Sequence, residues 1–162
     1  METRRTAARN VKWKIKRQIV WAAAAVLTFA SAAPARAAIL DNGDLYIPIA
    51  EVTEKAVFYP MNIEGTEMEA FAVKAPDGTI RTALNTCQIC YGSGRAYYEQ
   101  QGDIFVCQNC GNPFNASQIE IIRGGCNPVP IPAKYKTADE KGITIPRDFL
   151  VRAKIIFRNW KR

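Results

Sequence analysis

Residues 87–111 read CQICYGSGRAYYEQQGDIFVCQNCG, which is two Cys-x2-Cys pairs separated by sixteen residues. Two residues between cysteines allow both sulfurs to face one ion, and four thiolates form the tetrahedral site that zinc and iron share. Gly111 follows the second pair and can adopt the positive φ that often closes such a turn, whereas Tyr91 stands at the equivalent place after the first pair. The spacing therefore predicts a metal site formed by Cys87, Cys90, Cys107 and Cys110.

The segments around these pairs have the composition of short strands separated by turns. Pro76-Asp77-Gly78 is a turn because Pro presets φ and Gly supplies a positive φ, and it lies between predicted strands over 68–74 and 79–84. A second hairpin is predicted for 95–99 and 104–106, so that each cysteine pair follows a strand and sits at the tip of a hairpin. Further strands are predicted over 44–52, 55–59, 119–123 and 143–145, with Pro48 and Pro60 at edges or strand ends.

The C-terminal part of the chain is basic and contains the one predicted helix. Residues 147–160 have an amphipathic pattern, and Pro146 stands at the start. Residues 141–162 carry seven basic groups against Asp148, a local charge of +6. Two interpretations remain open: a solvated helix face balanced by acids elsewhere in the fold, or contact with anionic headgroups or a membrane partner.

The charge of the chain is concentrated at its N-terminus. The formal net charge of the 162 residues is +7, and residues 1–37 hold eight basic groups and one acid, so the remaining residues are neutral overall. A neutral domain lacks the clustered cations that phosphate-backbone binding requires, so we expect no nucleic-acid partner. The length suits one domain, over 38–162, after an N-terminal leader over 1–37.

The leader has the three parts of a secretory signal peptide. Residues 1–18 are polar and basic, residues 19–34 carry no charge, and Ala35-Arg36-Ala37 offers small residues where signal peptidase reads. Cleavage after Ala37 is predicted, and an uncleaved N-terminal membrane anchor is the alternative. In both cases the domain is exported, either periplasmic or anchored on the outer face of the inner membrane.

The chain contains no histidine and five cysteines. Ser-His-Asp and Cys-His catalysis and imidazole metal sites are therefore excluded. Besides a redox metal, the two pairs are compatible with structural zinc, with disulfides, and with thiol–disulfide exchange. Disulfides are disfavoured because five is odd, and exchange is disfavoured because neither pair opens a helical pattern.

Cys126 is the fifth cysteine and lies in Gly124-Gly125-Cys126-Asn127-Pro128. It is either a free buried thiol or a fifth thiol of the metal site, as a replacement ligand or as part of an adjacent second site. Nearby aromatic residues are predicted to be core or cluster-shielding groups rather than electron relays: Tyr97, Tyr98 and Phe105.

From about residue 45 to residue 145 the chain resembles the membrane iron–sulfur-containing FtrD-like family. The resemblance is carried by residues 77–81 (DGTIR), 87–91 (CQICY), 107–114 (CQNCGNPF) and 124–130 (GGCNPVP). It implies a redox or metal-handling role beside an iron-permease system, with iron or an iron–sulfur cluster as the cofactor. Many relatives carry several membrane helices, so this chain would be the soluble module alone.

A weaker similarity in architecture links residues 107–130 to Rieske proteins, with cysteines in place of histidines. It implies a mainly β domain, a small Rieske-like β-barrel with a rubredoxin- or zinc-ribbon-like metal site and a short C-terminal helix. Cys126 would lie on the covering loop. A four-thiolate cluster would have a low potential compared with a Rieske centre, because cysteine adds negative charge.

Together these observations predict an exported metalloprotein with iron or an iron–sulfur cluster, acting in electron transfer or metal binding rather than as an enzyme. Its expected partners are membrane iron-permease components or a redox partner, and the N-terminus or the basic tail offers a membrane contact. A zinc-stapled interaction module is the first alternative, and a thiol–disulfide oxidoreductase is the second.

Overall fold

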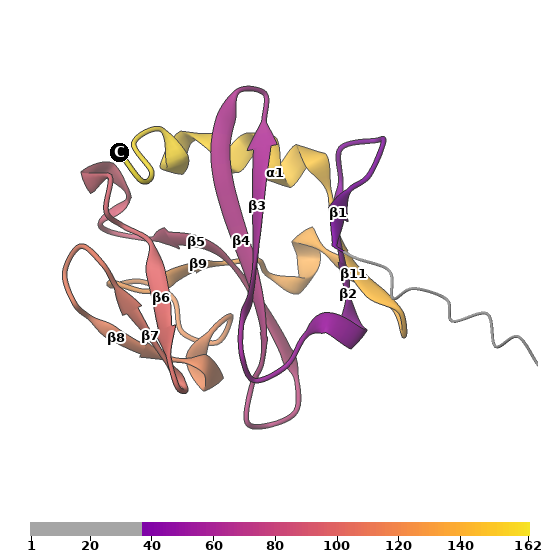
Figure 1. The fold of residues 1–162 in the computed structure, drawn as a ribbon, viewed down its shortest axis with the longest axis horizontal. Coiled ribbons are helices and arrows are strands. Elements are labelled where there is room, and N and C mark those ends of the chain that lie inside the picture. The colour runs from indigo at the N-terminus through magenta and orange to yellow at the C-terminus, as the bar shows by residue number, and fades with distance from the viewer. Residues whose placement is uncertain (1–36) are drawn as a thin grey trace, which may run out of the picture. The chain divides into compact units, whose positions relative to one another are not determined.

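The computed structural model describes residues 37–162, so the predicted signal peptide lies outside the described residues except for Ala37. The described chain forms three antiparallel sheets and one α-helix, which confirms the predicted mainly β class and the C-terminal helix. The long β3–β4 hairpin stands between the other two sheets (Figure 1). No helix within residues 37–162 has the length and hydrophobicity needed to cross a membrane.

The first sheet joins the two ends of the domain. It comprises β1 (Ala38–Ile39), β2 (Leu45–Pro48), β11 (Gly142–Ile145) and β10 (Thr137–Ala138), in that spatial order. Pairing of β2 with β11 places Ile47 opposite Ile143, and both side chains are buried. The predicted strand over 44–52 ends early, because residues 49–51 form the 3₁₀ turn η1 (Ile49–Glu51).

The second sheet contains the longest strands and has the spatial order β3-β4-β5-β9. The predicted turn at Pro76-Asp77-Gly78 is confirmed: Gly78 has a φ of +81° and its N–H donates to the carbonyl of Ala75 at 2.8 Å. Pro60 lies in an edge strand, as predicted for a residue without an N–H. The strands are β3 (Val57–Ile63), β4 (Thr66–Lys74), β5 (Ile80–Cys87) and β9 (Pro128–Pro130).

The third sheet is small and carries the second cysteine pair. It consists of β6 (Tyr98–Gln101), β7 (Ile104–Cys107) and β8 (Pro113–Asn115). Its β6–β7 hairpin is the second hairpin that the sequence predicts. The chain passes from β5 to β6 through the 3₁₀ turn η2 (Tyr91–Ser93).

The predicted helix over 147–160 is divided. The α-helix α1 (Arg147–Ala153) continues as the 3₁₀ segment η5 (Lys154–Phe157). Arg147 and Lys154 both pair with Glu64, and Lys161 Nζ lies 3.2 Å from Glu69 Oε1. Acids from β4 and the β3–β4 turn thus balance part of the basic tail.

The predicted strand over 119–123 is wrong. Asn115 caps the 3₁₀ turn η3 (Ala116–Gln118) with a capping box, and the N–H groups of Ile121 and Ile122 donate to the carbonyl of Gln118. Glu120 has a φ of +66°. Local side-chain to backbone hydrogen bonds therefore turn the chain where its composition favours a strand.

Two buried clusters hold the sheets together. One lies between α1 and the first two sheets and includes Ile47, Leu84 and Leu150. The other lies between the second and third sheets, where Phe71 stacks on Phe105 with ring centroids 4.8 Å apart. The segment after β9 contributes η4 (Ala133–Tyr135), which packs Tyr135 against the α1 residue Phe149. The second cluster contains the buried cysteines, so the core of the domain and the cysteine site are continuous.

Candidate metal centre

The two cysteine pairs begin where strands of different sheets end. Cys87 is the last residue of β5, and Cys107 is the last residue of β7. The second pair lies in the β7–β8 turn, as predicted for a hairpin tip. The first pair does not lie at a hairpin tip, because β5 and β6 belong to different sheets. The pairs therefore meet because the two sheets pack together.

Backbone hydrogen bonds fix the turn around each pair. The N–H of Cys90 donates to Cys87 Sγ at 3.4 Å, which is the contact expected for a Cys-x2-Cys turn. In the second turn the N–H of Gly111 donates to the carbonyl of Cys107 at 2.8 Å, with Gly111 at a φ of +71°. Gly111 thus has the conformation that the sequence predicts for it.

The pairing of two strands brings Cys126 to the site, and the position of Cys126 in the sequence does not predict this pairing. Strand β9 pairs antiparallel with β5 and places Pro128 opposite Cys87. Cys126 lies two residues before Pro128, and Cys90 lies three residues after Cys87, so the antiparallel pairing brings the two cysteines together. Their Sγ atoms are 3.7 Å apart.

Gln88 ties the loop of Cys126 to the first cysteine turn. Its backbone N–H donates to the carbonyl of Asn127 at 2.9 Å, and its side chain accepts from the N–H of Gly124 and donates to the carbonyl of Pro128. Gly124 and Gly125 both have positive φ. The sequence alone does not predict a role for Gln88 or for Asn112, whose side chain donates to the Cys126 carbonyl at 3.2 Å. Only the position of these two residues inside the cysteine motifs indicates that they belong to the site.

All five sulfurs converge in two overlapping groups. The Sγ atoms of Cys87, Cys90 and Cys107 lie within 4.8 Å of one another, and so do those of Cys90, Cys110 and Cys126. Cys90 belongs to both groups. The five cysteines, all within the described residues, are free thiols rather than disulfides. The sequence leaves two possibilities for Cys126, a free buried thiol or a fifth thiol of the metal site, and the structure places its Sγ in the second group.

The burial of the cysteines decreases from the core side of the site to its solvent side. Cys87 and Cys107 are buried, Cys90 and Cys126 are half-buried, and Cys110 is exposed. Behind the buried thiols Tyr98 and Phe105 are almost fully inaccessible, as predicted for groups that shield the site. The Tyr98 hydroxyl donates to the Cys126 carbonyl at 2.8 Å. Tyr97 is half-buried and lies farther out.

Hydrogen bonds stabilise the thiolate form of two cysteines. Burial alone raises the pKa of Cys87, but the polar side chain of Tyr98 and hydrogen bonds from backbone N–H groups of its own turn outweigh burial, and the net pKa is lowered. The backbone N–H of Asn112 lowers the pKa of Cys110. One buried thiol and one exposed thiol are therefore prepared to ionise.

The other three thiols hold their protons more tightly. Burial raises the pKa of Cys107 to about 12, and burial also raises the pKa of Cys90. The pKa of Cys126 is raised by hydrogen bonding to Cys110 and by burial. Five negative charges cannot gather here without a compensating cation, because each thiolate opposes ionisation of its neighbours. A metal ion bound by these thiols would supply that charge and displace the protons.

The donor set fits a thiolate-bound metal. Four thiolates at about 2.3 Å from a tetrahedral ion lie ~3.8 Å from one another, close to the Cys90–Cys126 separation of 3.7 Å. Zinc and iron both accept this set, and Fe–S clusters are held by cysteine thiolates. The arrangement thus suits metal binding at a site with one solvent-facing side.

Comparison with known proteins agrees with this chemistry. A family model described as "Membrane iron-sulfur containing protein FtrD-like" matches residues 52–157, well over half of the chain. No curated protein and no solved structure matches. The matched region contains all five cysteines and the strands β5, β7 and β9 that position them. The chain therefore belongs to the FtrD-like family of membrane iron–sulfur proteins.

Proposed function

We propose that the chain is an exported metalloprotein that binds iron or an iron–sulfur cluster through Cys87, Cys90, Cys107, Cys110 and Cys126. It passes electrons to or from a membrane iron-uptake partner, and it is an electron-transfer or metal-handling protein rather than an enzyme. The bound iron supplies a one-electron redox couple. The residues of the chain hold the iron and shield it on its inner side.

The convergence of five free thiols carries this proposal. Sulfurs from three separate segments form two groups, and within each group all Sγ atoms lie within 4.8 Å of one another. The hydrogen bonds of Gln88 and Tyr98 hold those segments together. The site also has a graded exposure, from buried Cys87 to exposed Cys110. Electron transfer to another protein requires a centre close to the surface, and Cys110 supplies that side.

Visible spectroscopy and elemental analysis of one preparation test the cofactor. The full chain, expressed without added metal and purified without oxygen, should be coloured, contain iron, and lose charge-transfer absorption when dithionite is added. A colourless protein that holds one zinc per chain would replace the redox role with a structural one. Metal-free protein with two titratable dithiols would indicate thiol–disulfide exchange instead.

Variants connect the cofactor with the thiols. Cys107→Ser should remove most of the iron, because Cys107 is one of the two buried thiols that form the inner side of the site. Ile89→Ala is the matched control: it lies in the first cysteine turn, its side chain is 64% exposed, and it should leave iron content unchanged. Equal iron in both variants would remove Cys107 from the site.

Export and partner choice need separate measurements. Mass spectrometry of the protein from fractionated cells should find Ala38 at the N-terminus in the periplasmic or outer-face fraction. An uncleaved chain in the membrane fraction would support an N-terminal anchor, and an uncleaved chain in the cytoplasm would refute export. Reduced protein should transfer electrons to membranes that contain an iron permease and not to membranes from which the permease has been deleted.

A further inference from the structure

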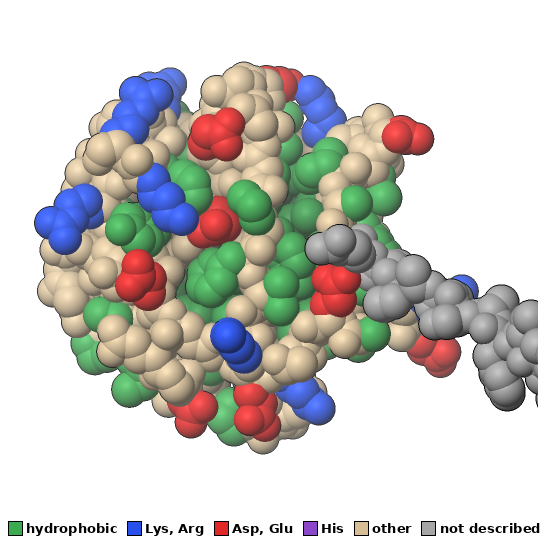
Figure 2. Space-filling view, viewed as in Figure 1, with side chains coloured by type: hydrophobic (Ala, Val, Ile, Leu, Met, Phe, Trp, Pro, Cys, Tyr) green, Lys and Arg blue, Asp and Glu red, His purple; other side chains and the backbone are tan. Residues whose placement is uncertain are grey.

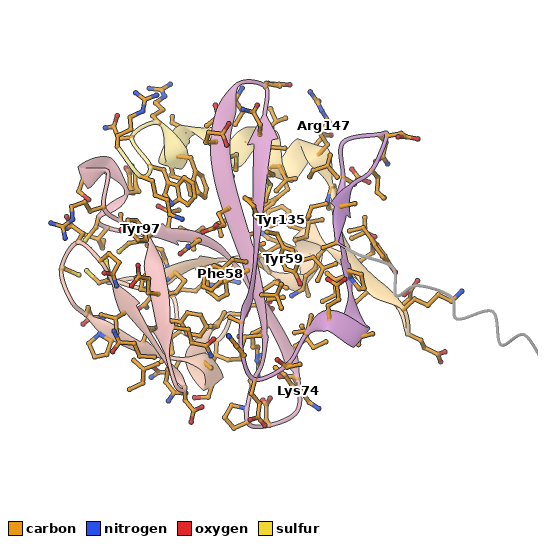
Figure 3. All side chains as sticks on the ribbon, viewed as in Figure 1. Phe58, Tyr59, Lys74, Tyr97, Tyr135 and Arg147 are labelled. Carbon is orange, nitrogen blue, oxygen red and sulfur yellow. The ribbon has the colours of Figure 1, made fainter. Side chains whose placement is uncertain are left out.

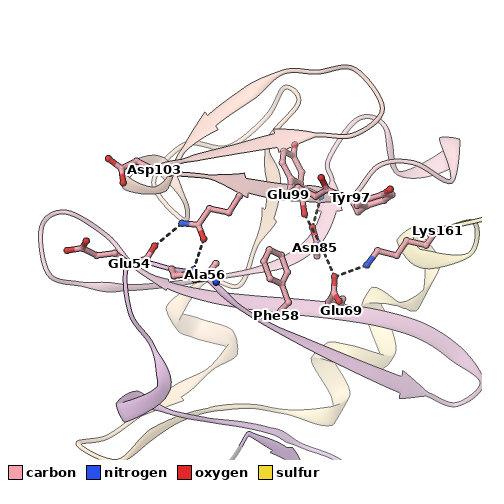
Figure 4. Close-up of a pocket in the computed structure, with 13 residues that line it drawn as sticks. Glu54, Ala56, Phe58, Glu69, Asn85, Tyr97, Glu99, Asp103 and Lys161 are labelled. Atoms are coloured by element: carbon pink, nitrogen blue, oxygen red, sulfur yellow. Dashed lines mark hydrogen bonds and ion pairs between the residues drawn. The ribbon is translucent and has the colours of Figure 1, made fainter.

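A cavity of about 760 Å³ opens between the second and third sheets, where β6 passes β3 and β4 (Figure 4). Phe58 and Tyr97 contribute aromatic walls and lie between the β3–β4 hairpin and the start of β6 (Figure 3). The same face presents hydrophobic side chains in its middle with acidic side chains among them (Figure 2). A volume between about 300 and 1,000 Å³ is typical of small-molecule sites.

Hydrogen bonds hold the cavity open at both ends. At one end the side chain of Gln100 accepts from the N–H of Ala56 at 2.6 Å and donates to the carbonyl of Glu54 at 2.8 Å. At the other end Asn85 donates to Glu69 Oε1 at 2.7 Å and accepts from the N–H of Tyr98 at 2.7 Å. These side chains join the walls directly, so the separation of the two sheets is fixed in advance of any ligand.

The charge of the lining favours a cation. Four carboxylates line the cavity against two ammonium groups, which gives the lining a formal charge of −2; the groups are Glu54, Glu69, Glu99 and Asp103 with Lys55 and Lys161. Glu69 lies deepest, with only 9% of its surface exposed. A nearly buried carboxylate is costly unless a donor or a positive charge meets it.

Lys161 already meets this carboxylate as a cation would. Its Nζ is 3.2 Å from Glu69 Oε1, 5.1 Å from the ring centroid of Tyr97 and 4.4 Å from that of Trp160. A carboxylate combined with aromatic faces is a typical ammonium site. Lys161 comes from the C-terminal segment after η5, and its side chain is 41% exposed, so its ammonium group can leave without moving either sheet.

We propose that this cavity binds a small organic cation. The ammonium or guanidinium group of the ligand replaces Lys161 against Glu69, and its apolar part packs on Phe58 and Tyr97. Tyr98 also lines the cavity and donates to the Cys126 carbonyl, so the ligand lies one side chain away from the cysteine site. The proposal does not depend on which metal the cysteines hold.

Calorimetric titration of the full chain with benzylammonium tests the proposal, with benzyl alcohol and benzoate as neutral and anionic probes of similar shape. Benzylammonium should bind the wild type, and Lys161→Met should bind it about tenfold more tightly, because the internal competitor is gone. Glu69→Gln should weaken binding roughly tenfold or more, the range for losing a hydrogen bond to a charged group. Lys55→Met is the matched control for the charge change and should alter affinity less than Lys161→Met does.

Melting curves recorded for each variant separate loss of binding from loss of the fold. If Glu69→Gln is unfolded, Tyr97→Leu provides the second test: it leaves the carboxylate in place and should weaken binding several-fold. Absence of binding by both the wild type and Lys161→Met overturns the proposal. Equal binding of benzyl alcohol, preferred binding of benzoate, or full affinity in folded Glu69→Gln overturns it as well.

Discussion

Removing the Glu120 carboxylate should destabilise the domain and loosen the loop that carries Cys126. Glu120 accepts hydrogen bonds from the backbone N–H of Thr82 at 2.6 Å and from its hydroxyl at 2.7 Å, and it pairs with Lys136. These contacts attach the segment before Cys126 to β5 and to the chain after η4. Glu120→Gln retains the shape of the side chain and removes its charge.

The expected magnitude follows from the burial of the pair. The side chains of Lys136 and Glu120 are only 9% and 13% exposed, so the variant leaves an ammonium group in a nearly closed environment. Breaking a buried pair by removing one partner costs ~3–5 kcal/mol. The glutamine oxygen still accepts from Thr82, and Lys136 retains its bond to the Thr82 hydroxyl at 2.8 Å. We therefore expect the free energy of unfolding to fall by ~2–4 kcal/mol.

Urea denaturation of Glu120→Gln, Lys136→Met and the double variant measures the interaction as a double-mutant cycle. The double variant should recover a large part of the loss, since neither charge is then left alone. Glu64→Gln is the control: its pair with Arg147 has side chains that are 43% and 44% exposed, and exposed pairs contribute little. Additive losses in the cycle, or a Glu120→Gln loss no larger than that of Glu64→Gln, would refute the reasoning.

The remaining predictions concern the core and the cysteine site. Phe71→Ala, which removes the ring stacked between the two sheets, should lower the free energy of unfolding by ~3–5 kcal/mol in urea denaturation. Gly111→Ala should lower it by ~1–2 kcal/mol and weaken metal retention, because Gly111 has a positive φ, whereas Gly92→Ala should have little effect. Burial raises the pKa of Cys107 from 9.0 to about 12, so folded metal-free protein binds this proton more tightly than unfolded protein does. Its stability should fall as pH rises from 9 towards 12, and stability that stays constant over this range in thermal melts would contradict the shift. Metal affinity measured by competition with a chelator should weaken as pH falls, because protons compete for the thiols.

The sequence predicts the local features of the fold well, because hairpins and cysteine turns depend on neighbouring residues. The turn at Pro76-Asp77-Gly78, the β6–β7 hairpin and the closure by Gly111 are all confirmed. The predicted strand over 119–123 is wrong because the capping box at Asn115 bends the chain first. The isoleucines of residues 119–123 give this segment the composition of a strand, but composition does not indicate that a side-chain cap competes with the strand.

The site depends on long-range pairing that no local pattern reveals. Pro128-Val129-Pro130 has the appearance of a loop, since two of its three residues lack an N–H, yet it forms β9 against β5. That pairing brings Cys126 beside Cys90, and the hydrogen bonds of Gln88 hold the loop there. The Cys-x2-Cys spacing predicts that each pair shares a ligand, but it does not predict how two sheets bring five sulfurs into overlapping groups.

The edges of the second sheet have a consequence for solubility. Its two outer strands are β3, which contains Pro60, and β9, which contains Pro128 and Pro130. A proline interrupts the row of donors that an incoming strand from another molecule would need, so these edges resist intermolecular β-aggregation. The sheet whose strand β5 ends in Cys87 is therefore protected at both of its edges from strand addition between copies.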